Sequence, residues 1–458
     1  MRIEKDSLGE KEVPEEVYYG IHTLRSMDNF GAAGDRLPLD IIYAMAQLKW
    51  ACAQANKEIG LLDTQKCDAI SAACLRVIRG EVEDQFPLDA FQAGSGTSSN
   101  MNVNEVISNL ACEELGGKKG ERNLVHPNDD VNKGQSTNNV FPSAIRVACV
   151  EQSNLLLNEL QKLIEALSER ALAFEEVIKS GRTHLQDAVP LTLGQEFGAY
   201  ARALNKDVVR IQQAQEKLLE LGVGGNAVGT GVNTKPVFRE TIICYLNKLT
   251  QEKYRTPEDG IEITQFLTDM AEASSALRAT ALDILKIGND LRLLTSGPNT
   301  GFQEIVLPPV EPGSSIMPGK INPSIVEASN MACLQVLGND HSVSVACGLG
   351  QLELNTHMPL VGYNLIKSFR ILERCCRMLT QKCIPGIKAN VETCTHNLQI
   401  SAGLPTILNP ILGYDRVAEL VKESLATKKT LKDLVLEKNI LSADEFGELM
   451  KTCTGPNL

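Results

Sequence analysis

Aromatic side chains make up only 4% of the 458 residues, so Leu, Ile, Val and Ala must supply most of the hydrophobic core. The chain also lacks a CxxC pair, and its 13 scattered cysteines fit neither a zinc site nor a disulfide framework. Reduced thiols in a cytoplasmic protein are the simplest interpretation. No apolar run is long enough to span a bilayer, and the charged start Met1–Asp6 has none of the apolar character of a secretory signal.

Positive charge is in deficit, because 45 Lys and Arg side chains stand against 57 Asp and Glu, which gives a formal net charge of −12. Such a surplus of carboxylates argues against nonspecific binding to nucleic acid or to anionic membranes. It does not exclude an anionic small molecule, since a local cluster of hydrogen-bond donors can dominate one site. We therefore expect neither nucleic acid nor a membrane as a partner.

Strand patterns are sparse, and helical periodicity dominates. Apolar residues at spacings of three and four predict several helices longer than 25 residues, which usually form a bundle or an oligomer core. A chain of this length is expected to fold as two or three domains. We expect an irregular start over residues 1 to 40, and helices over 39–80, 156–178, 197–218, 266–291, from Pro323 onward, 365–379, 430–438 and 442–451.

Four polar segments interrupt this apolar helical pattern, and each lies at or near the end of a long helix. They surround Thr97, Ser136 to Asn138, Thr183-His184, and Ser315 to Asn322. Helix N-termini offer free N–H groups and partial positive charge, so they suit carboxylates. Taken singly, each segment is more often a cap or a loop. Together, their hydroxyls, amides, imidazole and lysine have the chemistry to hold a small dicarboxylate.

The most specific of these segments is the run from Gly313 to Pro323, which reads GSSIMPGKINP. Its glycines allow backbone freedom, and Asn322-Pro323 is a favourable helix start. An ordinary linker is the alternative interpretation. The apolar Ile316 and Met317 argue against it, because a solvated linker does not favour such residues.

Four motifs resemble those of the fumarase/aspartase superfamily and occur in the expected order. GxGTxxNMN matches from Gly94, QS(S/T)N from Gln135, GRTxLQDA from Gly181, and GSSxMPxKxN from Gly313. The resemblance covers nearly the whole chain. It implies a mainly α fold, in which a central bundle of five long helices is flanked by two smaller domains, with boundaries that we place at 1–138, 139–393 and 394–458. It also implies a homotetramer in which three subunits share each active site.

The resemblance assigns roles to individual residues. Ser315 matches the catalytic base, and His184 completes the catalytic pocket together with Thr183. Glu327 matches a glutamate that pairs with this histidine and would fix its tautomer. The residues that match substrate-binding positions are Thr97, Ser136, Thr137, Asn138, Thr183, Lys320 and Asn322. A second, peripheral anion site would involve His126, Asn128 and Asp129, although a plain turn explains these three equally well.

The implied chemistry is a reversible anti elimination that yields fumarate, with no metal or organic cofactor needed. The base removes a proton next to a carboxylate, and the charge that develops there is stabilised by Lys320, Asn322 and helix N-termini. The leaving group distinguishes the members of the superfamily. The segment Tyr18 to Arg25 and the Ser136-Thr137-Asn138 version of the second motif resemble aspartate ammonia-lyases.

Other residues resemble class II fumarases, namely Gly94 to Thr97 and His126 to Asp129. Asn139 departs from the aspartate that is usual in both groups. We interpret the chain as an enzyme that releases ammonia from L-aspartate, with hydration of fumarate to L-malate as the alternative. A non-catalytic structural protein of the same fold is the third hypothesis, and the retained Thr97, His184 and Ser315 count against it.

Overall fold

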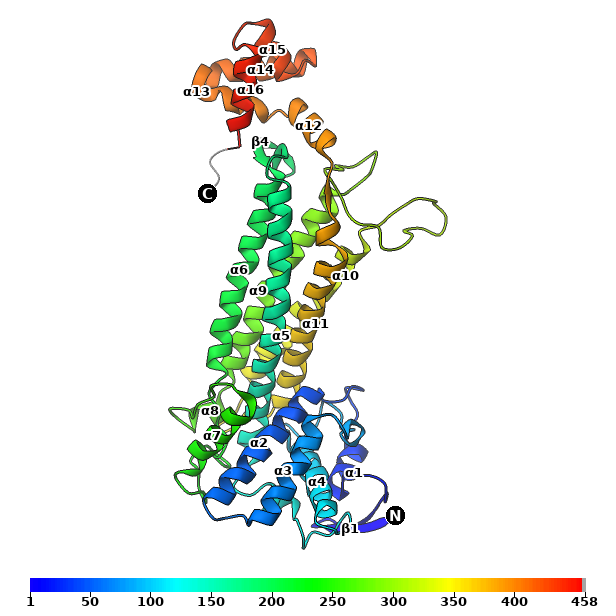
Figure 1. Cartoon of the computed structure of the whole chain (residues 1–458), viewed down its shortest axis with the longest axis vertical. Coiled ribbons are helices and arrows are strands. Elements are labelled where there is room, and N and C mark those ends of the chain that lie inside the picture. Colours follow the sequence, from blue (N-terminus) through cyan, green and yellow to red (C-terminus); the bar gives the residue numbers. More distant parts are fainter. Residues whose placement is uncertain (455–458) are drawn as a thin grey trace. The chain divides into compact units, whose positions relative to one another are not determined.

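The computed structural model describes residues 1–454, and within this range the chain forms sixteen α-helices and three two-stranded sheets (Figure 1). The chain divides into two compact units. Unit 1 comprises residues 1–157, 209–279 and 335–372, and unit 2 comprises residues 158–208, 280–334 and 373–454. None of the helices within residues 1–454 combines the length and the apolar composition needed to cross a membrane.

The start of the chain is more regular than the sequence analysis predicts. Strands β1 (Arg2–Asp6) and β2 (Gly9–Val13) form an antiparallel hairpin. Helix α1 (Ile21–Asn29) follows, so the expectation of an irregular segment over residues 1 to 40 is wrong. The sequence gives little signal for these strands, because four of the five residues of β1 (RIEKD) are charged and only Ile3 is apolar.

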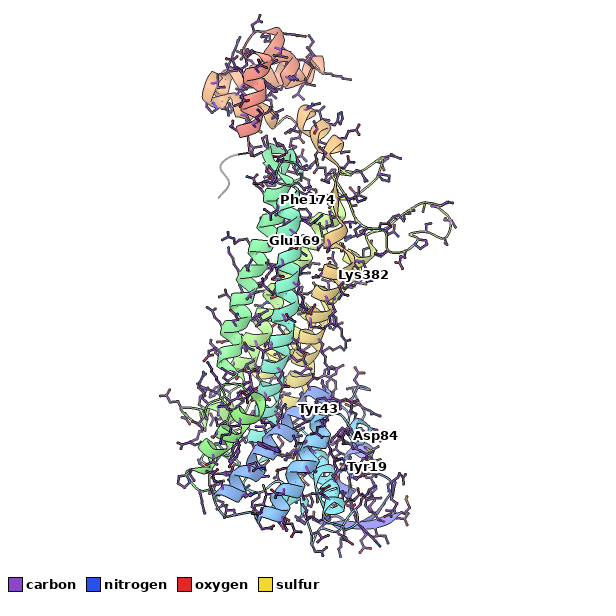
Figure 2. The ribbon with its side chains drawn as sticks, viewed as in Figure 1. Tyr19, Tyr43, Asp84, Glu169, Phe174 and Lys382 are labelled. Atoms are coloured by element: carbon purple, nitrogen blue, oxygen red, sulfur yellow. The ribbon has the colours of Figure 1, made fainter. Side chains whose placement is uncertain are left out.

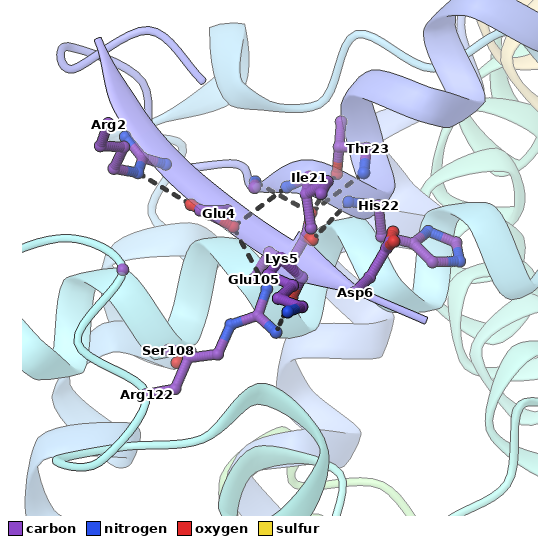
Figure 3. Close-up of polar contacts among 12 residues, drawn as sticks. Arg2, Glu4, Lys5, Asp6, Ile21, His22, Thr23, Glu105, Ser108 and Arg122 are labelled. Carbon is purple, nitrogen blue, oxygen red and sulfur yellow. Dashed lines mark hydrogen bonds and ion pairs between the residues drawn. The ribbon is translucent and has the colours of Figure 1, made fainter. Parts of the chain in front are cut away.

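A buried carboxylate fixes the start of α1. Glu105 lies on α4 (Thr97–Glu114) and accepts hydrogen bonds from the backbone N–H groups of Gly20, His22 and Thr23, at 2.9, 2.8 and 3.1 Å (Figure 3). The Thr23 hydroxyl donates a fourth bond of 2.6 Å. Burial raises the pKa of Glu105. The N-terminal N–H groups of a helix favour a carboxylate at this position, so Glu105 joins α1 to α4.

The helical pattern expected over residues 39–80 is two helices, α2 (Leu39–Glu58) and α3 (Thr64–Ile78). Asp63 fixes the start of α3, because its side chain accepts a hydrogen bond from the backbone N–H of Lys66 and so caps the helix. The remaining elements between α3 and the long helices are η1 (Glu83–Gln85), α4 and η2 (Pro127–Val131).

Five long helices run through both units, which confirms the predicted number. They are α5 (Thr137–Ala173), α6 (Leu193–Lys217), α9 (Thr268–Leu294), α10 (Ser324–Cys347) and α11 (Met358–Lys382). Two shorter helices, α7 (Phe238–Thr250) and α8 (Glu262–Gln265), lie between α6 and α9.

Helix α5 differs most from its predicted bounds. It begins at Thr137, well before residue 156, and it continues through Pro142. A proline lacks the N–H that would bond the carbonyl four residues earlier, which here belongs to Asn138. The helix ends at Ala173. Ile178, which the apolar spacing placed at the end of this helix, is instead the first residue of strand β3.

Inside each unit, the long helices pack through their apolar faces and through a few buried polar bonds. In unit 1, the Ser274 hydroxyl donates to Asp340 at 2.7 Å, and Asn339 donates to the Ser368 hydroxyl at 3.0 Å. In unit 2, Phe174 meets Phe197 edge-on with ring centroids 5.3 Å apart (Phe174 is labelled in Figure 2). Such contacts fix the axial positions of the helices.

Unit 2 also contains the two other sheets. Strands β3 (Ile178–Thr183) and β4 (Gln186–Thr192) form a hairpin, and β5 (Ile305–Val306) pairs with β6 (Lys388–Ala389). Short strands of this kind fit the expectation that strand patterns are sparse. The hairpin β3–β4 carries the third polar motif.

The C-terminal part of unit 2 is a small helical assembly around an apolar cluster that includes Leu408, Leu434 and Val435. Thr430 and Ser442 each form a capping box at the start of a helix, as their position before a helical pattern predicts. The elements are η3 (Ile384–Gly386), α12 (Val391–Ile400), η4 (Leu404–Leu408), α13 (Asn409–Leu412), α14 (Tyr414–Thr427), α15 (Leu431–Glu437) and α16 (Ala443–Thr452).

Candidate active site

The first polar segment lies at the start of α4. Thr97 is the first helical residue, and Gly96 before it adopts a φ of 82° in the left-handed region. A Cβ at Gly96 would lie 2.3 Å from the ring of Phe141, so only glycine allows α4 to begin directly against α5. The Thr97 hydroxyl lies 2.9 Å from that of Ser95 and is half-buried.

The second segment, Ser136 to Asn138, forms the start of α5 beside Thr97. Asn100 on α4 donates from Nδ2 to the Thr137 hydroxyl at 2.9 Å, which joins the first turns of the two helices. Asn138 donates from Nδ2 to the carbonyl of Ala227 at 2.8 Å, and so holds the Gly-rich segment after α6. Unit 1 therefore brings together Thr97, Thr137 and Asn138, all half-buried and accessible.

The backbone of these two helix starts has unused donors. The N–H groups of Thr97, Ser98 and Thr137 have no acceptor among residues 1–454. Two helix N-termini that lie next to each other, both with free N–H groups, form a favourable environment for a carboxylate. Asn139 is directed elsewhere, because its buried Nδ2 donates to the Thr264 hydroxyl at 2.8 Å.

The structure gives His126 a local role in its own turn. Its Nδ1 accepts the backbone N–H groups of Asn128, at 3.2 Å, and Asp129, at 3.0 Å. The backbone N–H of His126 donates to Asp130 at 2.8 Å, and Asp130 pairs with Lys66 at 2.7 Å. The imidazole therefore already accepts the backbone N–H groups of Asn128 and Asp129, and the second anion site at these three residues stays a prediction.

Thr183 and His184 lie at the tip of the β3–β4 hairpin. Thr183 pairs with Gln186, so His184 and Leu185 form a two-residue turn, and their φ angles are 56° and 59°. Positive φ at both turn positions is the type I′ pattern, which normally uses Asn or Gly. A histidine and a leucine there are strained, and strain of this kind concentrates at functional sites. Both side chains are exposed in the single chain.

A buried carboxylate anchors this hairpin. Glu304 is completely buried and lies 2.8 Å from the Arg182 guanidinium and 3.0 Å from Lys179 Nζ, both on β3. Asn397 on α12 donates to it at 3.2 Å. Burial alone would raise the pKa of Glu304, but the contacts with Arg182 and Lys179 hold it below its usual value. Glu304 lies in the segment that leads from α9 to the fourth motif, so its carboxylate joins the hairpin to that segment.

The fourth motif forms a closed loop between α9 and α10. The N–H of Gly313 donates to the carbonyl of Lys320 at 2.8 Å, and Asn322 donates from Nδ2 to the carbonyl of Gly313 at 2.8 Å. Ser314 caps the apex, because its Oγ accepts the N–H groups of Ile316 and Met317, at 3.2 and 3.0 Å. The loop therefore has a defined shape and is not a flexible linker.

The closed loop presents Ser315 and Lys320 to the exterior. Both side chains are exposed, and neither has a hydrogen-bond or ion-pair partner among residues 1–454. Within one chain, no hydrogen bond or ion pair among the described residues joins Ser315 to His184, or His184 to Glu327. The pairing of Glu327 with His184 stays a prediction. Asn322 holds the loop closed here, which is a role that the sequence did not indicate.

Sequence reasoning missed several polar residues behind the site. Lys49 on α2 is fully buried, and its Nζ contacts Asn100, Asn132 and Gln135. The sequence gives one indication of this burial, because Lys49 stands among Met45, Leu48 and Cys52 in a helical pattern. Nothing in the local sequence identifies its partners, because they come from segments more than 50 residues away.

Comparisons with known proteins identify the family and the fold of the chain. A family model described as lyase matches residues 9–338, and a model of the fumarase C C-terminus matches residues 404–452. The chain belongs to the fumarase/aspartase superfamily of lyases. The fold expected from the four motifs is thereby confirmed.

Individual relatives match over almost their whole length. An aspartate ammonia-lyase of Helicobacter pylori is 44% identical, with 98% of this chain and 97% of that protein covered. A class II fumarate hydratase of Thermosynechococcus vestitus is also 44% identical, over 97% and 96% of the two chains. A solved fumarate lyase:delta crystallin structure from Brucella melitensis has a TM-score of 0.96 and 42% identity, covering 99% of this chain and 100% of that one. Because the aspartate ammonia-lyase and the fumarate hydratase are equally identical to this chain, sequence identity does not decide between ammonia and water as the leaving group.

Proposed function

We propose that this lyase catalyses the reversible anti elimination of ammonia from L-aspartate to give fumarate. The observation that carries the proposal is the pairing of two accessible helix starts, where Thr97, Thr137 and Asn138 and three free N–H groups face the same region. This arrangement suits a substrate carboxylate. The serine-bearing loop supplies the other half of the chemistry, because it presents Ser315 and Lys320 without any competing partner.

In the proposed step, the alkoxide of Ser315 takes a proton from the carbon next to the β-carboxylate. The electron pair of that C–H bond moves into the carboxylate, which becomes a dianionic aci-carboxylate. The pair then forms the C=C bond as the neighbouring C–N bond breaks, and ammonia leaves with the electrons of that bond. Lys320 and the amide of Asn322 would stabilise the charge on the carboxylate where it develops.

An alkoxide needs stabilisation, because a serine hydroxyl is a poor base in water. Lys320 lies in the same closed loop as Ser315 and carries the nearest unpaired positive charge along the chain. Neutral His184, the Thr97 hydroxyl and the side-chain carbonyl of Asn138 would accept hydrogen bonds from the ammonium group of the substrate. Glu327 would orient His184 from an adjacent subunit.

We further propose that the active protein is a homotetramer with three subunits at each site. Met331, Leu334 and Val345 on α10 are 65%, 56% and 50% exposed in the single chain, and with Gly338 and His341 they recur at helical spacing. A row of exposed apolar side chains along one long helix is typical of a subunit interface. In the proposed assembly, the loop, the hairpin and the paired helix starts come from different subunits.

The thirteen cysteines, all within the described residues, form no disulfide, and ten of them are buried. This supports the proposal that the protein works in the reducing cytoplasm.

The leaving group is tested by following the ultraviolet absorbance of fumarate with purified protein and either L-aspartate or L-malate. We expect fumarate from aspartate. Fumarate from malate alone would show that the protein is a class II fumarase instead. The segment from His126 to Asp129, which resembles that of fumarases, favours this second candidate. Fumarate from neither substrate would indicate a structural protein.

A further inference from the structure

Lys49 is a buried cation without a counter-ion. Its side chain is completely buried in unit 1, and no carboxylate of residues 1–454 lies within ion-pair distance. Its Nζ contacts three neutral amide oxygens instead, Asn100 Oδ1 at 2.9 Å, Asn132 Oδ1 at 3.2 Å and Gln135 Oε1 at 3.3 Å. An ammonium group that is removed from water normally pairs with an anion. The interior of this unit provides none.

These amides connect the charge to the proposed site. Asn100 accepts from Lys49 with Oδ1 and donates with Nδ2 to the Thr137 hydroxyl at 2.9 Å. Gln135 lies immediately before Ser136, in the segment that starts α5. The ammonium therefore sits one side chain behind the paired starts of α4 and α5, whose N-termini already carry partial positive charge.

We propose that Lys49 is a positioning residue whose buried charge orients Asn100 and Thr137 and sets the affinity of the site for a dianion. The inference rests on the proposed function, because a bound dicarboxylate substrate would supply the negative charge that Lys49 lacks within the protein. Removal of the charge weakens binding of substrate and transition state alike, so it raises KM more than it lowers kcat.

The charge on Lys49 also makes binding depend on pH. Burial lowers the pKa of Lys49 to about 8. The ionisable groups that face it are the thiols of Cys52 on α2 and Cys74 on α3; burial raises the pKa of Cys52 to about 12 and raises that of Cys74 as well. Both thiols stay neutral, and the amides do not titrate. Lys49 is therefore charged below about pH 8, and the affinity for a dianion falls as the pH rises above that value.

The test measures the Kd of succinate, a non-reacting dicarboxylate, by titration calorimetry on the purified protein. Two variants at one position separate charge from packing: Gln135→Glu places a carboxylate beside Lys49 Nζ, whereas Gln135→Met removes the amide without adding charge. We expect Gln135→Glu to raise the Kd about tenfold or more at neutral pH, and Gln135→Met, which removes one of the three neutral acceptors of Lys49 without adding charge, to raise it clearly less. Lys49→Met is expected to raise the Kd and to abolish its increase above about pH 8.

Lys57→Met is the matched control, because Lys57 lies on the same helix and pairs with Asp68 at the surface. Its Kd is expected to be unchanged. The proposal is overturned if Gln135→Glu binds succinate as tightly as the original protein, or if Gln135→Met weakens binding equally. The comparison of the two Gln135 variants tests the proposal even if Lys49→Met fails to fold. Because calorimetry requires no turnover, a protein that forms no fumarate refutes the proposed reaction without deciding the role of Lys49.

Discussion

Replacement of Glu304 by glutamine tests how the β3–β4 hairpin is held in place. The completely buried carboxylate contacts Arg182 at 2.8 Å, Lys179 at 3.0 Å and Asn397 at 3.2 Å. Removal of one partner from a buried ion pair costs about 3 to 5 kcal/mol, because a desolvated charge is left behind. Lys179 retains Glu196 at 2.9 Å, so we expect a loss near the lower value, about 3 kcal/mol.

The loss is measured as a shift of the urea midpoint, and it is located by hydrogen exchange along β3–β4. Exchange of the hairpin amides is expected to accelerate more than exchange of the capped helices α15 and α16, since Glu304 contacts the hairpin directly. The matched control is Glu437→Gln, which breaks an exposed ion pair with Lys429 in the same unit and is expected to have little effect.

The pH dependence has a defined sign. Burial opposes ionisation of Glu304, but Arg182 and Lys179 more than compensate, so its pKa in the folded protein lies below the ordinary value of 4.5. Its contribution to stability is complete above about pH 4.5 and is lost as the pH falls through the lower folded pKa. Glu304→Gln should therefore flatten the acid limb of the stability curve. An unchanged urea midpoint and unchanged hairpin exchange would refute this reasoning.

Two further substitutions address the loop. Ser315→Ala removes the proposed base and is expected to reduce turnover by orders of magnitude while light scattering still shows the proposed tetramer; a near-normal rate would show that another group takes the proton. Gly313→Ala places a Cβ 2.7 Å from the Lys320 carbonyl and 2.8 Å from the Asn322 nitrogen, so it should open the loop and lower kcat. Gly447→Ala, where a Cβ meets no atom within 4 Å, is its control and should retain the original rate.

Local signals explain what the sequence predicted correctly. Thr430 and Ser442 precede short helical patterns and carry an acidic residue three positions later, and each forms a capping box. The long helices follow from their apolar periodicity over many turns. The sequence pattern predicts the ends of these helices less well: Pro142 has the character of a helix boundary but lies inside α5.

The errors arise where tertiary contacts decide. The β3–β4 hairpin turns at His184 and Leu185, which are poor turn formers, so no Asn or Gly marks it. Glu304 looks like an ordinary loop glutamate, and its partners lie more than 90 residues away in the sequence. Lys49 likewise contacts three amides from two later segments. Long-range pairings of this kind leave no local pattern.

The most direct test of a shared active site is complementation between two inactive variants, Ser315→Ala and Asn138→Ala. The two are co-expressed with different tags, and hybrid oligomers that carry both tags are isolated and assayed for fumarate formation. If the loop and the α5 start of one site come from different subunits, about one quarter of the sites in random hybrids receive both original residues, and activity returns to about that fraction. Hybrids that remain as inactive as either parent would contradict the account, because both residues would then serve a site from the same chain.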